Sequence, residues 1–424
     1  MSWFDKIIQI WKVKDLRNSI LFVLAMLVIF RFVAHIPLPG VDVENLRAFF
    51  SSNQVLGLMN VFSGGTMENF SVVALGIAPY ITASIIFQLL TMIIPQLEAL
   101  SKEPGGREKI NQYTRYATIP LALLQSYGMI TLLRQASRPI ITDVSPLSLG
   151  ITMLTITAGT IFLMWIGELI SEKKIGNGIS ILIFAGIISG LPGVIQRALF
   201  TFDKAQIFNI LLFAAIAIVT IIGVVIIAEG QRNVPVSYAK RVRGMRMYGG
   251  AATHLPIRVN MAGVIPIIFA ISIVLFPPMI AQFFLKARTE ILATMAQFVI
   301  DLFRNQAFYG IFYFLLVVAF TYFYTAVIFH PNQIAENLQK NGGFIPGIRP
   351  GRNTATYLQY ITNRVIFAGA LFLGAIAILP LLMQQFSGTS LVIGGTSLLI
   401  VVSVVIEIVK QTESQLTMRE YEGF

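Results

Sequence analysis

Long hydrophobic runs alternate with short polar connections along nearly the whole chain. Many of these runs approach the roughly 20 residues that an α-helix needs to cross a bilayer. We predict ten spans, near residues 19–37, 72–94, 116–133, 150–170, 178–198, 207–228, 262–284, 308–329, 365–383 and 391–408. The pattern therefore predicts an all-α polytopic membrane protein.

The segment before the first span has a different pattern. In MSWFDKIIQIWKVKD, apolar residues such as Trp3 and Ile7 are interleaved with lysines, which is typical of a helix lying on the membrane surface. The first span is too long for the apolar region of a signal peptide, and no A-x-A-like cleavage site follows it. We therefore expect it to remain in the protein as a membrane helix.

Basic residues indicate the orientation. Most of the 31 Lys and Arg residues fall in the tails and connections that share one side of the membrane with both termini. The positive-inside bias makes this side the cytoplasm. Two connections on this side, 229–261 and 330–364, are much longer than is usual in a compact bundle, and long connections often carry function. Ten spans also divide into two groups of five, which are then inverted relative to each other, as in many transport proteins.

Composition excludes several classes of function. The net charge of +11 follows from the basic connections, so it reflects orientation and anionic headgroups more than nucleic acid. The chain has no cysteine, and its three histidines show no metal-ligand spacing. It contains no G-x-x-x-x-G-K-S/T phosphate loop, and no catalytic triad or carboxylate pair stands out in the spans. We expect no enzymatic activity, no metal and no cofactor, so any energy comes from a partner.

Two stretches in and before the second span have patterns that could serve a channel or could be ordinary packing. The stretch VLGLMNVFSGGTMENF (55–70) is too short to cross the membrane and breaks at Gly64 and Gly65. It is either a re-entrant segment at an outer vestibule or a helix and loop lying on the outer leaflet. In the next span, Ile81, Ile85 and Ile86 follow helical spacing. This row either packs against lipid or core, or faces an apolar constriction that blocks ions by dewetting.

Charged residues are scarce inside the spans. Arg31, Glu168 and Glu407 lie near the ends of their spans, and we interpret them as boundary residues rather than as a proton relay. A transporter driven by protons or sodium would need more buried charge than this.

The two long connections differ in character. The first alternates polar and apolar residues around VPVSYAKRV, which predicts a hairpin-like pair of strands. Its basic and aromatic residues fit contact with nucleic acid, contact with the membrane surface, or a solvated orienting loop. In the second, FIPGIRPGR (344–352) holds Pro346 and Pro350, which fix backbone angles and offer Arg349 and Arg352 on a stiff tip. Such a tip suits docking to a partner.

Segments distributed along nearly the whole chain resemble the SecY family, the central subunits of protein-conducting channels. They occur in family order and are IPLPGVD (36–42), VFSGG (61–65), ALGIAPYITASIIFQLL (74–90), INQYTRY (110–116), GNGISILIFAGI (176–187), VPVSYAKR (234–241), GVIPIIF (263–269), NGGFIPGIRPG (341–351) and GGTSLLI (394–400). The resemblance implies two inverted halves that close like a clam shell around a pore. Residues 1–200 would form the first half, with a plug near 57–67, and residues 201–424 would form the second, with both long loops. A lateral gate would open between the second and third spans and the seventh and eighth.

The resemblance also implies roles for individual residues. The pore ring would consist of Ile81, Ile85, Ile187, Ile268 and Ile400. The plug would include Leu58, Met59, Asn60, Val61, Phe62, Ser63, Gly64 and Gly65. Docking of a motor or ribosome would use Arg241, Arg243, Arg246, Arg349 and Arg352. Glu68 and Phe87 depart from the residues common in the family.

The implied partners follow from the same resemblance. They are the SecE and SecG subunits, the SecA ATPase, the ribosome with its RNA as the sole nucleic acid, signal sequences, unfolded polypeptides and anionic lipids. The implied location is the bacterial cytoplasmic (inner) membrane, with both termini in the cytoplasm. Two other classes stay open. A secondary transporter would need a polar site at the membrane midplane, and a scaffold that only recruits cytoplasmic machinery would need neither ring nor plug.

Overall fold

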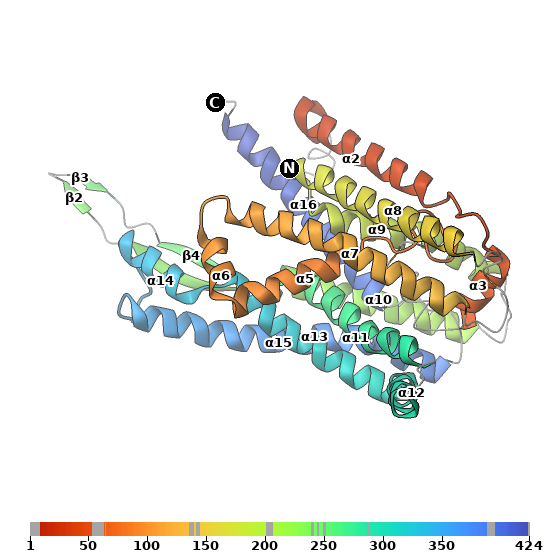
Figure 1. The fold of residues 1–424 in the computed structure, drawn as a ribbon. Coiled ribbons are helices and arrows are strands. Elements are labelled where there is room, and N and C mark those ends of the chain that lie inside the picture. The colour runs from red at the N-terminus through yellow and green to blue at the C-terminus, as the bar shows by residue number, and fades with distance from the viewer. Residues whose placement is uncertain are drawn as a thin grey trace. The chain divides into compact units, whose positions relative to one another are not determined.

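The computed structural model describes residues 9–52, 63, 65–134, 140, 145–200, 207–238, 241–243, 246–248, 252–285, 289–387 and 395–422. Helices dominate it (Figure 1). The chain forms two compact units. Unit 1 contains Met1–Ile207, Ser272–Asn305 and Val404–Phe424, and unit 2 contains Phe208–Ile271 and Gln306–Ser403.

A helix overlaps each predicted span. These helices are α2 (Lys14–Val33), α5 (Ala78–Ile93), α7 (Gly106–Arg134), α8 (Pro146–Glu172), α9 (Gly178–Phe200), α10 (Ile207–Glu229), α11 (Ile265–Phe284), α13 (Gln306–Ile328), α15 (Arg352–Ser387) and α16 (Gly395–Glu422). Among the described residues, 5 helical segments are long and apolar enough to cross a membrane alone, or 6 if a bent pair counts as one span. The helical multi-pass fold is confirmed, and the number of ten spans stays a prediction.

Shorter elements connect these helices. They are α3 (Val43–Ser52), α6 (Pro95–Lys102), α12 (Glu290–Arg304), α14 (Pro331–Lys340), β1 (Gln231–Tyr238), β2 (Arg241–Arg243), β3 (Arg246–Tyr248), β4 (Ala252–Arg258) and β5 (Gly343–Phe344). The predicted surface helix before the first span falls largely on residues 1–8, which lie outside the described part.

The second predicted span is shorter and more bent than its hydrophobic run. Its first residues, 72–77, form turns, and α5 begins only at Ala78 with Pro79 in its first turn, where a missing backbone N–H costs nothing. At the other end Pro95 begins α6, and the two helices meet at a bend of 102°. Proline therefore determines both ends of α5.

Glycine permits close helix contacts in unit 1, where α7 packs against α5 and α8, and α8 packs against α9 (Figure 1). A Cβ placed on Gly178 of α9 would lie 1.8 Å from the carbonyl oxygen of Gly167 in α8. A Cβ placed on Gly159 of α8 would lie 2.1 Å from the carbonyl oxygen of Val72. Small residues are the usual means by which membrane helices approach this closely.

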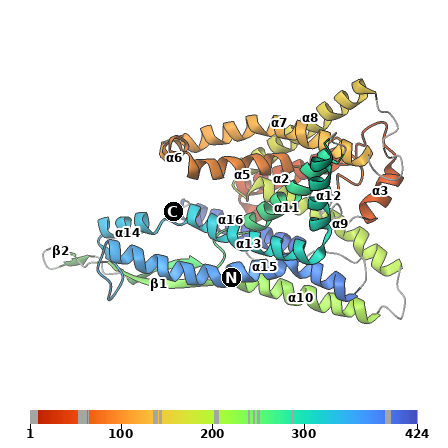
Figure 2. The ribbon, with the colours of Figure 1, turned by 60° about the horizontal axis from the view of Figure 1, so that its bottom comes forward.

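Unit 2 contains the two long connections and a small sheet. β1 pairs antiparallel with β4 from Gln231↔Arg258 to Ser237↔Ala252, and β5 adds to the other edge of β1. α14 and α15 lie beside this sheet (Figure 1, Figure 2). β2 and β3 form a separate two-stranded ribbon. The prediction of paired strands in the first long connection is confirmed, although its main pair joins the two ends of the connection.

Candidate functional site

The predicted ring residues of unit 1 lie on α5 and α9. Ile81 and Ile85 are one helical turn apart on α5; Ile85 is 4% exposed and Ile81 is half-buried. Ile86, the next residue in the same apolar row, is 39% exposed. Ile187 of α9 is 5% exposed. Burial therefore distinguishes Ile85 from Ile86, although the sequence pattern placed both in one apolar row.

Two contacts hold α5 against α7. The amide Nε2 of Gln125 donates to Thr82 Oγ1 at 3.4 Å. The rings of Phe87 and Tyr113 stack with their centroids 6.2 Å apart. Phe87, which the resemblance marked as a departure, therefore has an aromatic partner on α7. These contacts orient the helix that carries Ile81 and Ile85.

The predicted ring residues of unit 2 lie on α11 and α16. Ile268 is 8% exposed and Ile400 is 0% exposed. The neighbouring Phe269 meets the rings of Phe320 and Tyr324 edge-on, at centroid distances of 6.0 and 5.9 Å. Both partners lie on α13, so aromatic packing orients α11 beside it.

The five isoleucines are shared between the two units, so their assembly into one ring stays a prediction. What the structure adds is that four of them are buried and that each belongs to a helix. A ring of β-branched apolar side chains carries no directional polar group, so it resists water and ions without binding a passing chain tightly.

Most of the predicted plug, namely Leu58, Met59, Asn60, Val61, Phe62 and Gly64, lies outside the described residues. Ser63 is buried, and its carbonyl oxygen accepts a hydrogen bond of 2.9 Å from Thr66 Oγ1. Gly65 has φ +77°, a left-handed conformation that glycine adopts without strain. The described end of the plug segment is therefore anchored within unit 1.

The chain just after this anchor is irregular and buried. The backbone N–H of Leu38 donates to the carbonyl of Phe70, and that of Val72 donates to the carbonyl of Ile36, each at 3.0 Å. Phe70 is fully buried in spite of a φ of 42°. Irregular backbone at membrane depth requires such internal partners. This burial favours a re-entrant segment over a helix and loop on the membrane surface, and the plug assignment itself stays a prediction.

Of the charged groups in unit 1 that have side-chain partners, Glu168 lies near the end of its helix, whereas Glu407 lies in the middle of α16. Arg115 Nε donates to Glu168 Oε1 at 2.6 Å, which joins α7 to α8. Glu407 Oε1 accepts from Gln411 Nε2 at 3.2 Å. Pairs as exposed as Arg115 and Glu168 contribute about 0–1 kcal/mol, so they orient helices more than they stabilise them. The sequence could not reveal the pair because its members are far apart in the chain.

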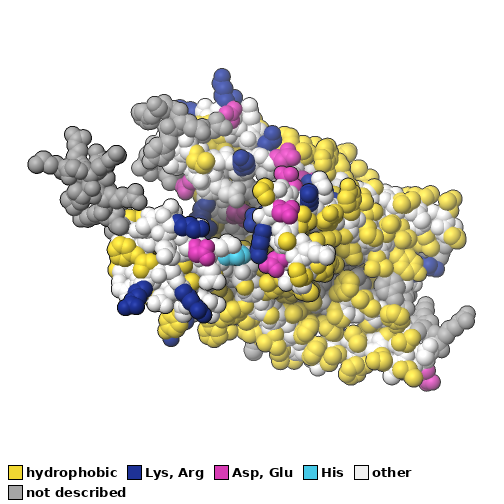
Figure 3. All heavy atoms as spheres, turned by 60° about the vertical axis from the view of Figure 1, so that its left-hand side comes forward, with side chains coloured by type: hydrophobic (Ala, Val, Ile, Leu, Met, Phe, Trp, Pro, Cys, Tyr) yellow, Lys and Arg dark blue, Asp and Glu magenta, His cyan; other side chains and the backbone are white. Residues whose placement is uncertain are grey.

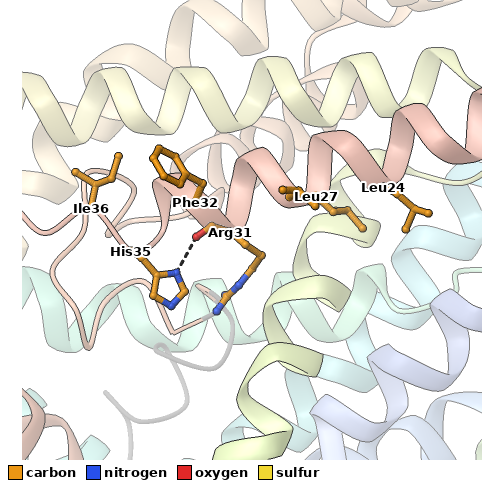
Figure 4. Close-up of a pocket in the computed structure, with 7 residues that line it drawn as sticks. Leu24, Leu27, Arg31, Phe32, His35 and Ile36 are labelled. Atoms are coloured by element: carbon orange, nitrogen blue, oxygen red, sulfur yellow. Dashed lines mark hydrogen bonds between the residues drawn. The ribbon is translucent and has the colours of Figure 1, made fainter.

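An open groove runs along the end of α2 (Figure 4). Its volume is about 840 Å³, and it is lined by Leu24, Leu27, Val28, Arg31, Phe32, His35 and Ile36. His35 Nδ1 donates to the carbonyl oxygen of Arg31 at 2.7 Å. Arg31 lies in the last turn of α2, which agrees with its interpretation as a boundary residue.

The two long connections meet in one sheet. Ser237 pairs with Phe344 and Tyr238 pairs with Gly343. Beneath the sheet lies a core of Val234, Val236, Ile257, Ile345, Leu358 and Ile361. Figure 3 looks onto the end with these loops and shows Lys and Arg side chains there, whereas hydrophobic side chains cover most of the rest of the visible surface. The predicted docking loops thus form one structural element.

The stiff tip is exposed. Arg349 and Arg352 both reach solvent, while Gly347 (φ 81°) and Gly351 (φ 97°) provide the turns around them. The carbonyl oxygen of Arg349 accepts a hydrogen bond of 3.1 Å from Thr354 Oγ1. Arg241, Arg243 and Arg246 belong to the β2–β3 ribbon, where Arg243 pairs with Arg246 across the strands.

The family model that describes SecY matches residues 71–409. The chain belongs to the SecY family. It is 44% identical to the protein translocase subunit SecY of Corynebacterium glutamicum, an alignment that covers 98% of this chain and 99% of the relative. It is 43% identical to the SecY of Mycobacterium tuberculosis, with 97% of each chain covered.

Solved SecY-type structures share the fold. One, described as the structure of a protein conducting channel, has a TM-score of 0.61 at 17% identity and covers 93% of this chain and 91% of its own. Another, Sec61 in the canine ribosome-channel complex, has a TM-score of 0.60 at 17% identity with the same coverage. Glu68, which the resemblance marked as a departure, is half-buried just after the predicted plug segment.

Proposed function

We propose that this chain is the non-catalytic, pore-forming subunit of a protein translocation channel. It passes unfolded secretory polypeptides across the membrane and releases transmembrane segments sideways into lipid. The observation that carries the proposal is the 43–44% identity to translocase subunits over nearly the full length of both chains. The TM-score of 0.61 to a protein-conducting channel supports the fold that this function needs.

We assign the detailed arrangement on the same basis. Residues 1–200 and 201–424 form the two inverted halves, and the plug lies near 57–67. The lateral gate opens where α5 and α7 face α11 and α13. SecE and SecG are the partner subunits, and SecA or the ribosome docks on the paired long loops and supplies the driving force. The membrane is the bacterial cytoplasmic membrane, with both termini in the cytoplasm.

Residue chemistry favours a polypeptide channel over the other classes. A secondary transporter needs polar groups at the midplane, whereas the ring positions are all isoleucine. Among the described residues, no cluster of three or more His, Cys, Asp or Glu side chains could hold a metal ion. A scaffold would need the loops but not a ring of isoleucines, so an experiment on the proposed ring distinguishes a channel from a scaffold.

Photocrosslinking tests the ring directly. A photoreactive residue at Ile85 or at Ile268 is expected to form adducts with a secretory polypeptide stalled in transit, because both side chains would line its path. Phe367, which is 55% exposed on α15, is the control facing lipid. The measurement is the adduct yield on gels. If neither ring position reacts while the stalled chain is engaged, the ring assignment is wrong.

Replacing Ile268 with Asn is expected to loosen the closed channel. A buried amide without a hydrogen-bond partner costs about 1–3 kcal/mol, whereas in an open, water-filled pore the amide bonds to water. The population of the closed state relative to the open state should therefore fall on the order of tenfold. The measurement is ion conductance of the purified complex in planar bilayers. Ile311→Asn, at a residue that is 64% exposed on α13, is the control and should leave conductance unchanged. Equal conductance in both variants would favour the scaffold class.

A further inference from the structure

The helix α12 (Glu290–Arg304) was not expected from the hydrophobic runs. It lies in the connection between α11, which ends at Phe284, and α13, which begins at Gln306. With 15 residues it is too short to cross a bilayer, and it carries Glu290, Asp301 and Arg304. It is therefore a separate element at one end of two membrane helices.

The helix has three sides. Ala296 is 5% exposed and marks the buried side of the helix. Thr294, Gln297 and Asp301 occupy a polar side, where Gln297 Nε2 donates to Asp301 Oδ1 at 3.1 Å. The side between these two is apolar and exposed. Its members are Ile291 (70% exposed), Leu292 (44%), Met295 (62%) and Phe298 (65%).

The spacing makes this apolar side continuous. Residues at positions i, i+1, i+4 and i+7 lie along one stripe of an α-helix. Four large apolar side chains at such exposures would be unfavourable in water, so a further apolar phase has to cover them.

Connectivity identifies that phase. A single residue, Asn305, separates the end of α12 from α13. α13 begins one of the segments that are long and apolar enough to cross the membrane, and its early residue Ile311 is 64% exposed. The end of α12 is therefore held at the membrane boundary. The apolar phase around the first turns of α13 is lipid, so the covalent link through Asn305 brings the stripe on α12 within reach of lipid.

We propose that α12 is an interfacial helix whose apolar stripe, Ile291, Leu292, Met295 and Phe298, inserts into the lipid leaflet at the start of α13. The predicted topology makes this the outer leaflet. Helices of this kind bury their apolar side about 5–10 Å into the boundary between headgroups and acyl chains. The proposal rests on the membrane assignment of α13, not on the translocation function.

Spin labelling tests it, because the chain has no cysteine and a single introduced thiol is the only site of attachment. Met295→Cys and Phe298→Cys place the label on the apolar stripe. Thr294→Cys and Gln297→Cys are matched controls on the polar side of the same helix. The complex with its partner subunits is reconstituted in phosphatidylethanolamine and phosphatidylglycerol vesicles, and power saturation compares oxygen with a water-soluble nickel chelate.

At 295 and 298 we expect oxygen to relax the label more strongly than the nickel chelate, with a depth of about 5–10 Å below the phosphates. At 294 and 297 we expect the nickel chelate to dominate. Strong nickel access at 298 would mean that the stripe faces water and would overturn the proposal. Exclusion of both reagents at 298 would mean that protein covers the stripe, which would also overturn it. Neither result depends on translocation.

Discussion

Replacing Gly178 with alanine is expected to cause the largest loss of stability. The added Cβ would lie 1.8 Å from the Gly167 carbonyl oxygen and 2.9 Å from Ser171 Oγ, which accepts a hydrogen bond from the Gly178 N–H at 2.9 Å. Both Gly167 and Gly178 are held by backbone, so no side-chain rotation relieves the clash. Overpacking typically costs about 1–3 kcal/mol and occasionally more, and a clash with rigid backbone belongs at the upper end of that range.

Gly190→Ala is the matched control, because a Cβ on Gly190 of the same helix meets nothing within 4 Å. The measurement is the fraction of monodisperse complex that survives heating, followed by size-exclusion chromatography. We expect the surviving fraction of the Gly178 variant to be well below that of the parent, and the surviving fraction of the Gly190 variant to equal it. A Gly178 variant as stable as the parent would show that α8 and α9 do not meet as closely as described.

Charge reversal at Arg349 is expected to have the largest effect on function. The side chain is exposed, so the change should leave folding intact. Loss of a charge-assisted contact, together with repulsion from the same partner group, costs about 2–5 kcal/mol at an interface. By that reasoning Arg349→Glu should reduce translocation driven by the motor at least about tenfold.

Lys340→Glu makes the same change of charge in the same long connection, at an exposed residue of α14. The measurement is uptake of a precursor into inverted membrane vesicles with the motor and ATP, alongside the melting temperature of each complex. If both substitutions reduce uptake to the same extent, the overall charge of the loop matters and the stiff tip has no special role. Unchanged uptake at Arg349 would remove it from the docking surface.

The membrane spans were predictable because a bilayer imposes one length on every helix that crosses it. A rule based on run length overestimates the length of the second span, because residues 72–77 are apolar but form turns before the helix begins at Ala78. The short helix α12 was missed because its 15 residues are too few for a membrane span and polar residues interrupt its apolar ones, so its signal is periodic rather than a continuous run.

The sequence by itself determined the class of protein, the approximate positions of its long helices and the family, through run lengths and short segments in order. Only the tertiary structure decided that Ile85 is buried while Ile86 is exposed, that Arg115 meets Glu168, and that β5 joins the two long connections into one sheet. The physical reason is range. Run length and periodicity are local properties of the chain, whereas burial, ion pairs and strand pairing depend on residues that only folding brings together.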